Sequence, residues 1–588
     1  MRKSTMIFVP DRKHARLIAL DLTGYASSDD DPDYFLGDET FNNWDKLDAD
    51  DALKQTIKSG VGILHEGMSR KLVRDIKVLY RNEIIKALVI VHDMCWEVGD
   101  LNWYMSIILD PVTYDYVQGR YIEYPMSEIL QMIGRASRIE NDVSNSRWEF
   151  FCHTPLKDYF YKFIAEPLPV ESNLEHVLHD TINAEVVVET ILSQQDVIDW
   201  ITWTFMYRRL IQNPNYYNLN GKTGTHINDH LSELIEKTVD ELVESACIKV
   251  EENEEETIEP TNLGRIAAYY NIKHTTIKLF EENLNENRKM KHLLEIISAA
   301  EEFEALPIRE SDESQLRNIR YLEYRVDTED GIFSIPNIKT NILLQTHFLR
   351  VPLGVDLSQD QNKVLEISLN MVHAMVDVIS SNGWLAPALL AMELSQMIVQ
   401  ASLVKQSTLY QLPYFDSDLV ERCQDSGIKD INDLLEMDDE PRIQLLGLSE
   451  NQLEDVAKVC NWIPNYSIKA AVNKEDPNEG KLEEEIKVLV EIEKDDEEGE
   501  DDEEDLSLKV YAPYYPKDKD EQWWLIIADE RNNRLLSIKR VQPKLAQQLE
   551  ITFTPSETGN FRFTAMLVWD SYIGCDVTDD FDMMIYQN

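Results

Sequence analysis

Gln131-Met132-Ile133-Gly134-Arg135-Ala136-Ser137-Arg138 is the stretch around which the first part of the chain is organised. Its two arginines lie three residues apart after a glycine, so a short turn or helix start places both guanidinium groups on one side. A guanidinium group keeps its charge and binds phosphate oxygens in pairs. Arg135 and Arg138 are therefore predicted to contact a nucleotide phosphate.

The remainder of a nucleotide-hydrolysing site is missing from the sequence. Such a site also needs a glycine-rich loop that ends in Lys and Ser or Thr, and an acidic pair that holds magnesium. The nearest match to the loop is Gly221-Lys222-Thr223, but Tyr216 occupies the position that requires the upstream glycine. This stretch therefore indicates an ordinary loop, and the chain carries half of a nucleotide cleft.

The composition favours a large acidic protein that binds other proteins. With 588 residues the chain is too long for one core, and about four domains are expected. Lys and Arg number 57 against 108 Asp and Glu, which gives a net charge of −51. Nucleic-acid affinity comes largely from Lys and Arg that displace counterions, so the whole chain is not expected to bind nucleic acids strongly. A partner with basic surfaces suits this charge better.

Cysteine usage and hydropathy indicate a reducing compartment and no membrane segment. The six cysteines are scattered without a close pair, which argues against a disulfide framework and a zinc ribbon. The most apolar predicted helix, residues 384–404, carries Glu393 and several Gln and Ser, so it is expected in a core. The apolar run at residues 6–9 is too short for a signal peptide and indicates a strand. A domain that starts on a core strand is typical of a chain cut from a longer protein.

The first domain, residues 1–170, alternates strands and helices. Continuous apolar runs predict buried strands at residues 5–9, 61–64, 87–91 and 106–109, with helices at 11–25 and 70–80. This alternation is typical of a parallel sheet covered by helices, which binds ligands at the carboxyl ends of its strands. His65-Glu66-Gly67 and the Gln131 to Arg138 turn are predicted to lie at that edge.

The motifs of this domain resemble a known family. The chain contains, in order, Ile7-Phe8-Val9-Pro10, Gly62-Ile63-Leu64-His65-Glu66-Gly67-Met68, Cys95-Trp96 and the Gln131 to Arg138 stretch. They resemble the ordered motifs of the second RecA-like lobe of Ski-like superfamily-two helicases. By this resemblance Gln131, Gly134, Arg135 and Arg138 form a remnant nucleotide-binding motif.

Longer strings resemble the C-terminal cassette of the two-cassette spliceosomal RNA helicases. They are Ala165-Glu166-Pro167-Leu168-Pro169-Val170-Glu171-Ser172, Trp203-Thr204-Phe205-Met206-Tyr207-Arg208-Arg209, Gln212-Asn213-Pro214-Asn215-Tyr216-Tyr217-Asn218-Leu219, Leu294-Glu295-Ile296-Ile297-Ser298 and Ser380-Ser381-Asn382-Gly383-Trp384-Leu385. The resemblance implies a nuclear chain whose partners are spliceosomal proteins and the active helicase cassette. RNA is expected to bind only weakly or through the parent protein.

The family's C-terminal cassette is hydrolytically dormant and serves as a protein-binding and regulatory platform, and one departure in this sequence agrees with that. Active relatives carry Trp-Gly-x-Asn, whereas this chain has Trp96-Glu97-Val98-Gly99-Asp100. ATP and magnesium are expected only in a full-length parent, and no cofactor is expected for this chain. Two alternatives stay open: an ATP-hydrolysing cassette that uses Arg135 and Arg138, and the related helicase of the transcription coactivator complex.

Residues 175–280 are predicted to form a winged helix. Helical periodicity covers residues 184–211 and 227–245, and two short strands flank residues 251–256. That wing tip consists of five Glu and one Asn, so it is interpreted as a solvated tip and not as a phosphate contact.

Residues 281–405 are predicted to form a helical bundle with helices at 293–303, 340–349, 363–379 and 384–404. In the family such a bundle holds the helix that lies across single-stranded nucleic acid. Lys339, Gln345 and Arg350 could face that channel, and the alternative is an ordinary solvated helix face.

The last two predicted domains are a small helical module and a β-sandwich. Residues 406–466 contain predicted helices at 423–437 and 449–460, and Leu446-Gly447-Leu448-Ser449 resembles a helix-hairpin-helix turn without its second glycine. Residues 467–588 change to period two and indicate an immunoglobulin-like sandwich. Its loop 495–505 has ten acids in eleven residues, so we expect it to be disordered, either as a solubilising loop or as a docking site for a basic partner.

Two histidine pairs have spacings that a metal ion could use. They are His176 with His179, and His226 with His230. No carboxylate or cysteine cluster completes either set, so no metal site is predicted.

Overall fold

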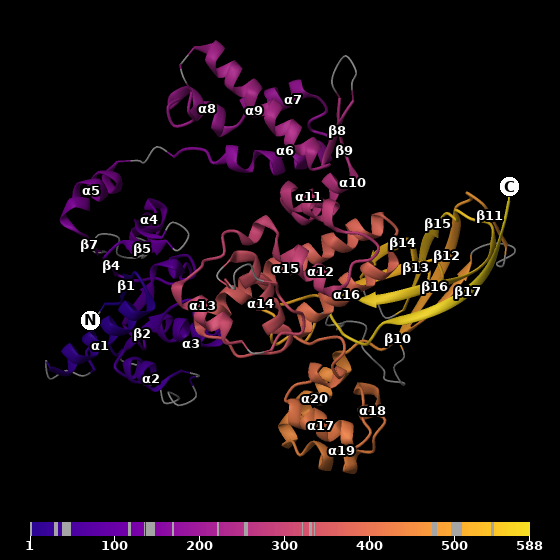
Figure 1. The fold of residues 1–588 in the computed structure, drawn as a ribbon. Helices are drawn as coiled ribbons and strands as arrows, with labels where there is room; N and C mark the ends of the chain where they lie inside the picture. The colour runs from indigo at the N-terminus through magenta and orange to yellow at the C-terminus, as the bar shows by residue number, and fades with distance from the viewer. Residues whose placement is uncertain are drawn as a thin grey trace. The chain divides into compact units, whose positions relative to one another are not determined.

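A computed structural model describes most of the chain. The described residues are 3–28, 33–37, 47, 49–115, 119–134, 136, 147–166, 170–219, 221, 223–251, 257–319, 321–327, 332–333, 335–472, 479–494, 509–542 and 546–587. The chain divides into two compact units, Met1–Val170 (unit 1) and Glu171–Asn588 (unit 2) (Figure 1).

Unit 1 is built on a parallel five-stranded sheet, as the apolar runs predict. The strand order is β2 (Val61–Leu64), β3 (Ala87–Val91), β1 (Thr5–Val9), β4 (Met105–Leu109) and β7 (Arg147–Phe151). Every neighbouring pair is parallel. The strands β1, β2 and β3 are almost entirely buried because helices cover the sheet. The RecA-like identity of this unit stays a prediction.

The other elements of unit 1 connect or cover these strands. They are α1 (Arg12–Ser28), α2 (Asp51–Lys58), α3 (Arg70–Arg81), η2 (His92–Cys95), α4 (Met126–Gly134), η4 (Thr154–Leu156), α5 (Lys157–Ala165) and the hairpin β5 (Val112–Asp115) with β6 (Arg120–Glu123). The Ser69 side chain caps α3 by accepting a hydrogen bond from the Leu72 amide. The edge strand β7 was not predicted, because its polar and aromatic residues lack a continuous apolar run.

Unit 2 begins with helices and a two-stranded wing. These elements are η5 (Leu174–Val177), α6 (Leu178–Val187), α7 (Gln194–Thr202), α8 (Phe205–Gln212), α9 (Gly224–Glu244), β8 (Ile248–Val250), β9 (Ile258–Pro260), α10 (Asn262–Tyr270) and α11 (His274–Asn283). The single helix predicted at residues 184–211 is wrong. The backbone turns at Glu189, whose φ is +61°, and the side chains of Ser193 and Thr204 start new helices as N-caps. The predicted wing tip lies largely outside the described residues.

The helical bundle follows. Its elements are α12 (Met290–Ser298), η6 (Glu301–Phe303), α13 (Glu310–Arg317), α14 (Pro336–Phe348), α15 (Val355–Ser381) and α16 (Leu385–Gln400). By length and composition α15 could cross a membrane, contrary to the sequence prediction of no such segment, but 72% of its apolar window is buried inside the protein. That burial is typical of a core helix.

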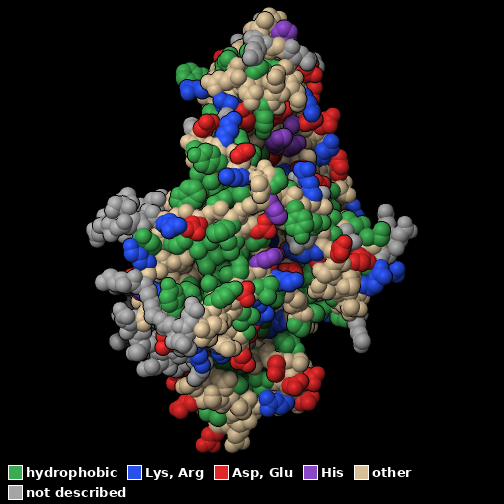
Figure 2. Space-filling view, turned by 90° about the vertical axis from the view of Figure 1, so that its left-hand side faces the viewer, with side chains coloured by type: hydrophobic (Ala, Val, Ile, Leu, Met, Phe, Trp, Pro, Cys, Tyr) green, Lys and Arg blue, Asp and Glu red, His purple; other side chains and the backbone are tan. Residues whose placement is uncertain are grey.

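The small helical module has its own hydrophobic core. After η8 (Thr408–Gln411) it contains α17 (Ser417–Asp425), α18 (Ile431–Leu435), α19 (Asp439–Leu446) and α20 (Glu450–Trp462). The single helix predicted at residues 423–437 is wrong because Gly427, with φ of +89°, separates α17 from α18. On the face shown in Figure 2, Asp and Glu side chains gather on this module.

Two sheets enclose the C-terminal core of unit 2. One has the order β10 (Tyr466–Val472), β12 (Ile486–Lys494), β15 (Ala546–Phe553), and the other β11 (Glu479–Lys481), β17 (Val577–Tyr586), β16 (Gly559–Trp569), β13 (Trp523–Asp529), β14 (Arg534–Val541). Strand β13 is buried on both faces: Trp523 faces the sandwich core and Trp524 packs into the core shared with the helical bundle. The immunoglobulin-like topology stays a prediction, and loop 495–505 lies outside the described residues.

Candidate functional site

The carboxyl ends of the strands in unit 1 bring several charged residues to one edge of the sheet. Asp11 follows β1, Glu66 follows β2, His92 follows β3 and Asp110 follows β4. Because parallel strands end on the same side, these residues share the edge where such sheets bind ligands. Helix α4, which carries Gln131, is held at this edge by the contact of Glu128 with His92.

Glu66 is bound by helix α1. The Nε atom of Arg12 lies 2.5 Å from Glu66 Oε1. The neighbouring His65 accepts a hydrogen bond at Nδ1 from the Gly67 amide, at 3.2 Å. Burial lowers the pKa of His65. The negative charge of Glu66 opposes this shift, and the positive charge of Arg12 adds to it. The loop after β2 is therefore an ordered turn with a neutral imidazole and a paired carboxylate.

His92 forms a second, unpredicted cluster at this edge. It is buried, its Nδ1 lies 3.3 Å from Glu128 Oε2, and its Nε2 lies 3.1 Å from Asp93 Oδ1. Its ring stacks on Tyr124 at 4.4 Å between centroids. Burial raises the pKa of Tyr124. This cluster joins the end of β3 to the helix that carries Gln131, and no local sequence pattern links its members.

Two residues of the predicted nucleotide-binding motif, Gln131 and Gly134, lie at the end of α4. Gln131 is half-buried, and Gly134 is exposed with open space around its Cα. The Ser106 hydroxyl of β4 donates to the Met132 carbonyl at 2.8 Å, which ties the helix to the sheet. Arg135 and Arg138 lie outside the described residues. Their contact with a nucleotide phosphate stays a prediction.

The segment that follows Trp96, where this sequence departs from the family motif, is bound by side chains of helix α3. Asp100 Oδ1 lies 2.7 Å from Lys77 Nζ, Arg81 pairs with the same carboxylate, and Lys77 also donates to the Glu97 carbonyl at 2.9 Å. Burial alone would raise the pKa of Asp100, but the hydrogen bond and charge of Lys77 outweigh it and the pKa is lowered. Lys77 and Arg81 are thus both paired with Asp100.

Lys339, predicted to face a nucleic-acid channel, is instead completely buried. Its ammonium group donates to the Pro307 carbonyl at 2.7 Å and to the carboxylates of Asp312 and Asp360 at 2.6 and 2.7 Å. Arg309 also pairs with Asp360, at 2.5 Å. The three donors of the ammonium are used inside unit 2, so the expected orientation toward a channel is a wrong prediction for this side chain.

Gln345 and Arg350 also bind protein groups. The Gln345 side chain is buried and exchanges hydrogen bonds with the backbone of Tyr324, at 2.8 and 2.9 Å. The Arg350 guanidinium donates to the carbonyls of Gln400, Ala401 and Tyr410 at 2.8–3.1 Å. Both side chains therefore join segments of unit 2, an arrangement that matches neither the nucleic-acid channel nor the solvated helix face expected from the sequence.

The histidine pairs do not form as their spacing suggests. His226 contacts the Thr223 hydroxyl, and His176 is exposed. His179 instead meets Glu241 and His274, and the three form a group that could hold a metal ion. Neither predicted pair is therefore brought together as a set, and the Glu241 and His274 side chains near His179 come from distant helices.

Comparison with known proteins agrees with the sequence motifs. The Sec63 Brl domain model matches residues 260–582, more than half of the chain, and a winged helix-turn-helix domain model matches residues 171–252. The chain is 42% identical over 581 residues to the U5 small nuclear ribonucleoprotein 200 kDa helicase of Drosophila melanogaster, and 40% identical over 580 residues to that of Homo sapiens. It is 38% identical over 584 residues to an activating signal cointegrator 1 complex subunit 3-like protein of Dictyostelium discoideum.

Each match covers 98% of this chain and 26% of the relative, so the chain spans about a quarter of the length of these curated relatives. They confirm the predicted resemblance to the C-terminal cassette of the two-cassette spliceosomal helicases. The chain therefore belongs to the family of proteins that carry the Sec63 Brl domain behind a winged-helix domain.

Proposed function

We propose that this chain is a protein-binding and regulatory cassette of a spliceosomal RNA helicase, and that it does not itself move along RNA. The observation that carries the proposal is the state of helix α14. Residues 338–348 of this helix are all buried, and its cation Lys339 is neutralised by Asp312 and Asp360. A helix that tracks a phosphate backbone needs free donors toward the strand.

The sheet edge of unit 1 supports the same function. Its described carboxylates include Asp11, Glu66, Asp93 and Asp110, and its cation Arg12 is paired with Glu66. A cleft that stabilises the charge of a transferring phosphoryl group needs cations and Mg²⁺ at that place. ATP with Mg²⁺ is proposed only for the full-length parent, where Gln131, Gly134, Arg135 and Arg138 would face a nucleotide.

The partners proposed are other spliceosomal proteins and the active cassette of the same parent, in the nucleus. The net charge of −51 favours partners with basic surfaces. The acidic side chains on α17–α20 offer one such surface (Figure 2). The second candidate is a subunit of a transcription coactivator complex, favoured by the Dictyostelium relative; the higher identity of the U5 helicases favours splicing.

Measurement of ATP hydrolysis by the full-length parent tests the proposed regulatory role. Arg135→Ala and Arg138→Ala are expected to leave its RNA-stimulated ATPase rate within twofold of the wild type. The same substitutions in the corresponding motif of the other cassette serve as the positive control and are expected to abolish the rate. A tenfold loss from Arg135→Ala or Arg138→Ala alone would establish the ATP-hydrolysing alternative.

Co-purification separates the two assemblies. Tagged full-length parent is expected to recover U5 small nuclear RNA from nuclear extract. Recovery of coactivator subunits without that RNA would support the second candidate instead.

A further inference from the structure

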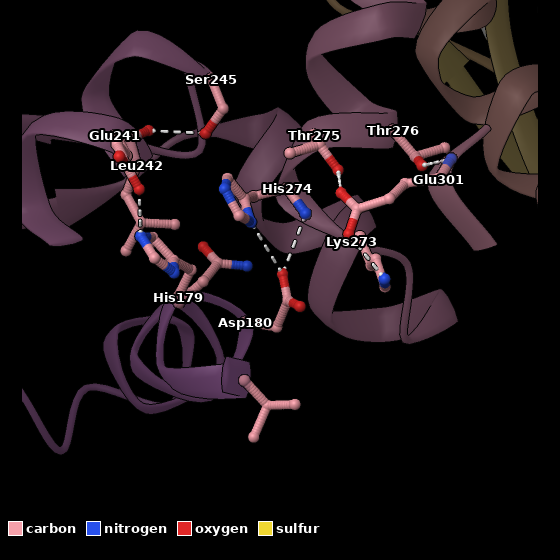
Figure 3. Close-up of polar contacts among 12 residues, drawn as sticks. His179, Asp180, Glu241, Leu242, Ser245, Lys273, His274, Thr275, Thr276 and Glu301 are labelled. Carbon is pink, nitrogen blue, oxygen red and sulfur yellow. Dashed lines mark hydrogen bonds and ion pairs between the residues drawn. The ribbon is translucent and has the colours of Figure 1, made fainter. Parts of the chain in front are cut away.

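Three side chains of the types that can hold a metal ion converge in unit 2 where α6, α9 and α11 meet (Figure 3). His179 comes from α6, Glu241 from the last turn of α9 and His274 from the first turn of α11. We propose that His179, Glu241 and His274 bind one zinc ion that links the winged-helix region to the start of the Sec63 Brl region. This inference goes beyond the proposed function and does not depend on it.

The distances suit a single ion. His179 Nε2 lies 2.6 Å from Glu241 Oε2, and one ligand atom from each of the three residues lies within 4.8 Å of the others. Ligands at 2.0–2.1 Å from a tetrahedral zinc are about 3.3 Å apart. Small side-chain rotations would therefore bring all three into coordination.

Asp180 fixes the orientation of one imidazole. Its Oδ1 accepts a hydrogen bond from the His274 amide at 2.9 Å and lies 3.3 Å from His274 Nδ1. With Nδ1 held by a carboxylate, Nε2 is the nitrogen left to bind a metal. A carboxylate behind a metal-binding histidine is the usual second contact in zinc sites.

His179 shows a polar atom suited to a ligand. Its Nε2 is buried and makes no hydrogen bond of acceptable geometry, although Glu241 Oε2 is close. The two imidazole rings stack at 4.5 Å with an interplanar angle of 12°.

The first turn of α11 is held independently of any metal. The Lys273 amide donates to Glu302 Oε1 at 3.0 Å, and the Thr276 hydroxyl donates to Glu302 Oε2 at 2.5 Å. His274 is therefore positioned by the bundle, whereas His179 and Glu241 belong to the region matched by the winged-helix model. An ion between them would fix the winged helix relative to the bundle.

The donor set selects the metal. Two imidazole nitrogens and one carboxylate oxygen suit zinc, whereas Mg²⁺ and Ca²⁺ prefer sites made of oxygen. Three protein ligands would leave a fourth position for water.

Zinc titration of the metal-free 588-residue chain tests the proposal. Millimolar Mg²⁺ is included to occupy the acidic surface, and a chromogenic chelator reports free zinc. We expect one equivalent to bind, and His179→Gln and His274→Gln each to weaken binding at least tenfold. His176→Gln is the matched control, because His176 lies on the preceding turn and is exposed; it should bind zinc like the wild type.

Two further readouts guard against misfolding of a variant. Co²⁺ should give visible absorption bands in the wild type and in His176→Gln, and zinc should raise the thermal midpoint of both by several degrees. Glu241→Gln, whose side chain is 40% exposed, should fold and lose that zinc-dependent rise. The proposal is overturned if the wild type binds no stoichiometric zinc, or if His179→Gln and His274→Gln bind it as tightly as His176→Gln.

Discussion

The Nζ atom of Lys339 lies 2.7 Å from Oδ2 of Asp360, and both side chains are buried. The pair joins α14 to α15, and Asp312 and Arg309 extend it to α13 and the segment before it. Charges taken out of water must be paired to be tolerated. The lysine therefore contributes to the packing of the helical bundle.

Replacement of Lys339 should damage folding before it affects RNA binding. Lys339→Met removes the positive charge that pairs with two buried carboxylates. We therefore expect the free energy of unfolding to fall by about 3–5 kcal/mol. The control Lys363→Met, on an exposed position of α15, should cost less than about 0.5 kcal/mol. Urea unfolding measures both. If Lys339→Met keeps full stability and lowers RNA affinity, the nucleic-acid role predicted from the sequence is correct.

A pair of glycine substitutions tests the junction between the wing and α10. A Cβ at Gly264 would lie 2.0 Å from the Cys247 carbonyl oxygen, so Gly264→Ala must displace the backbone. We expect it to lower the free energy of unfolding by about 1–3 kcal/mol. Gly24→Ala, in α1 with open space around it, should instead stabilise its helix by about 0.5–1 kcal/mol. Thermal unfolding distinguishes them; equal effects would contradict the close approach at Gly264.

Glu171 should make the winged-helix region sensitive to acid. The hydrogen bonds from Arg209, then that from Asn213, lower the pKa of Glu171 from 4.5 to about 2. Because the folded state holds this proton less tightly than the unfolded state, the stabilisation is complete above about pH 4.5 and is lost as the pH falls toward 2.

The stability difference between wild type and Glu171→Gln, measured by denaturant unfolding, should therefore shrink steadily from pH 6 to pH 3. Glu233→Gln, at an exposed position of α9, provides the control and should show a much smaller change with pH. A difference for Glu171→Gln that does not depend on pH would rule out the lowered pKa.

Asp377 should have the opposite pH dependence. Burial raises the pKa of Asp377 above 3.8. The hydrogen bond that Asp377 accepts from the Tyr270 hydroxyl, at 2.7 Å, lowers the pKa but does not cancel the effect of burial. The folded state then binds the proton more tightly, so this group makes the protein more stable as the pH falls through the folded pKa. Asp377→Asn should raise the thermal midpoint at pH 7, and the gain should shrink at lower pH. A lower midpoint at pH 7 would show that the charged carboxylate is needed.

Local patterns predicted the parts of the fold in which one element can be recognised by itself. The strands β1, β2 and β3 were predictable because buried parallel strands are continuously apolar. Strand β17 cannot be recognised from its own residues, because acids such as Asp580 and Asp582 interrupt its apolar pattern. These acids lie opposite Thr564 and Arg562 of β16.

Helix boundaries were harder to predict than helices. Periodicity persists across Glu189 and Gly427, so the breaks there were not visible. A left-handed residue and a new N-cap divide such a stretch without changing its hydrophobic spacing.

The sequence by itself determined the parallel sheet of unit 1, the strongly acidic character and the resemblance to the family, because each depends on local periodicity, composition or motif order. Only the tertiary structure decided that Lys339 is buried beside Asp360 and that His179 meets His274 and not His176. The physical reason is that spacing along one helix reports which residues share its face, whereas the partner of a side chain on that face is set by the packing of other elements against it.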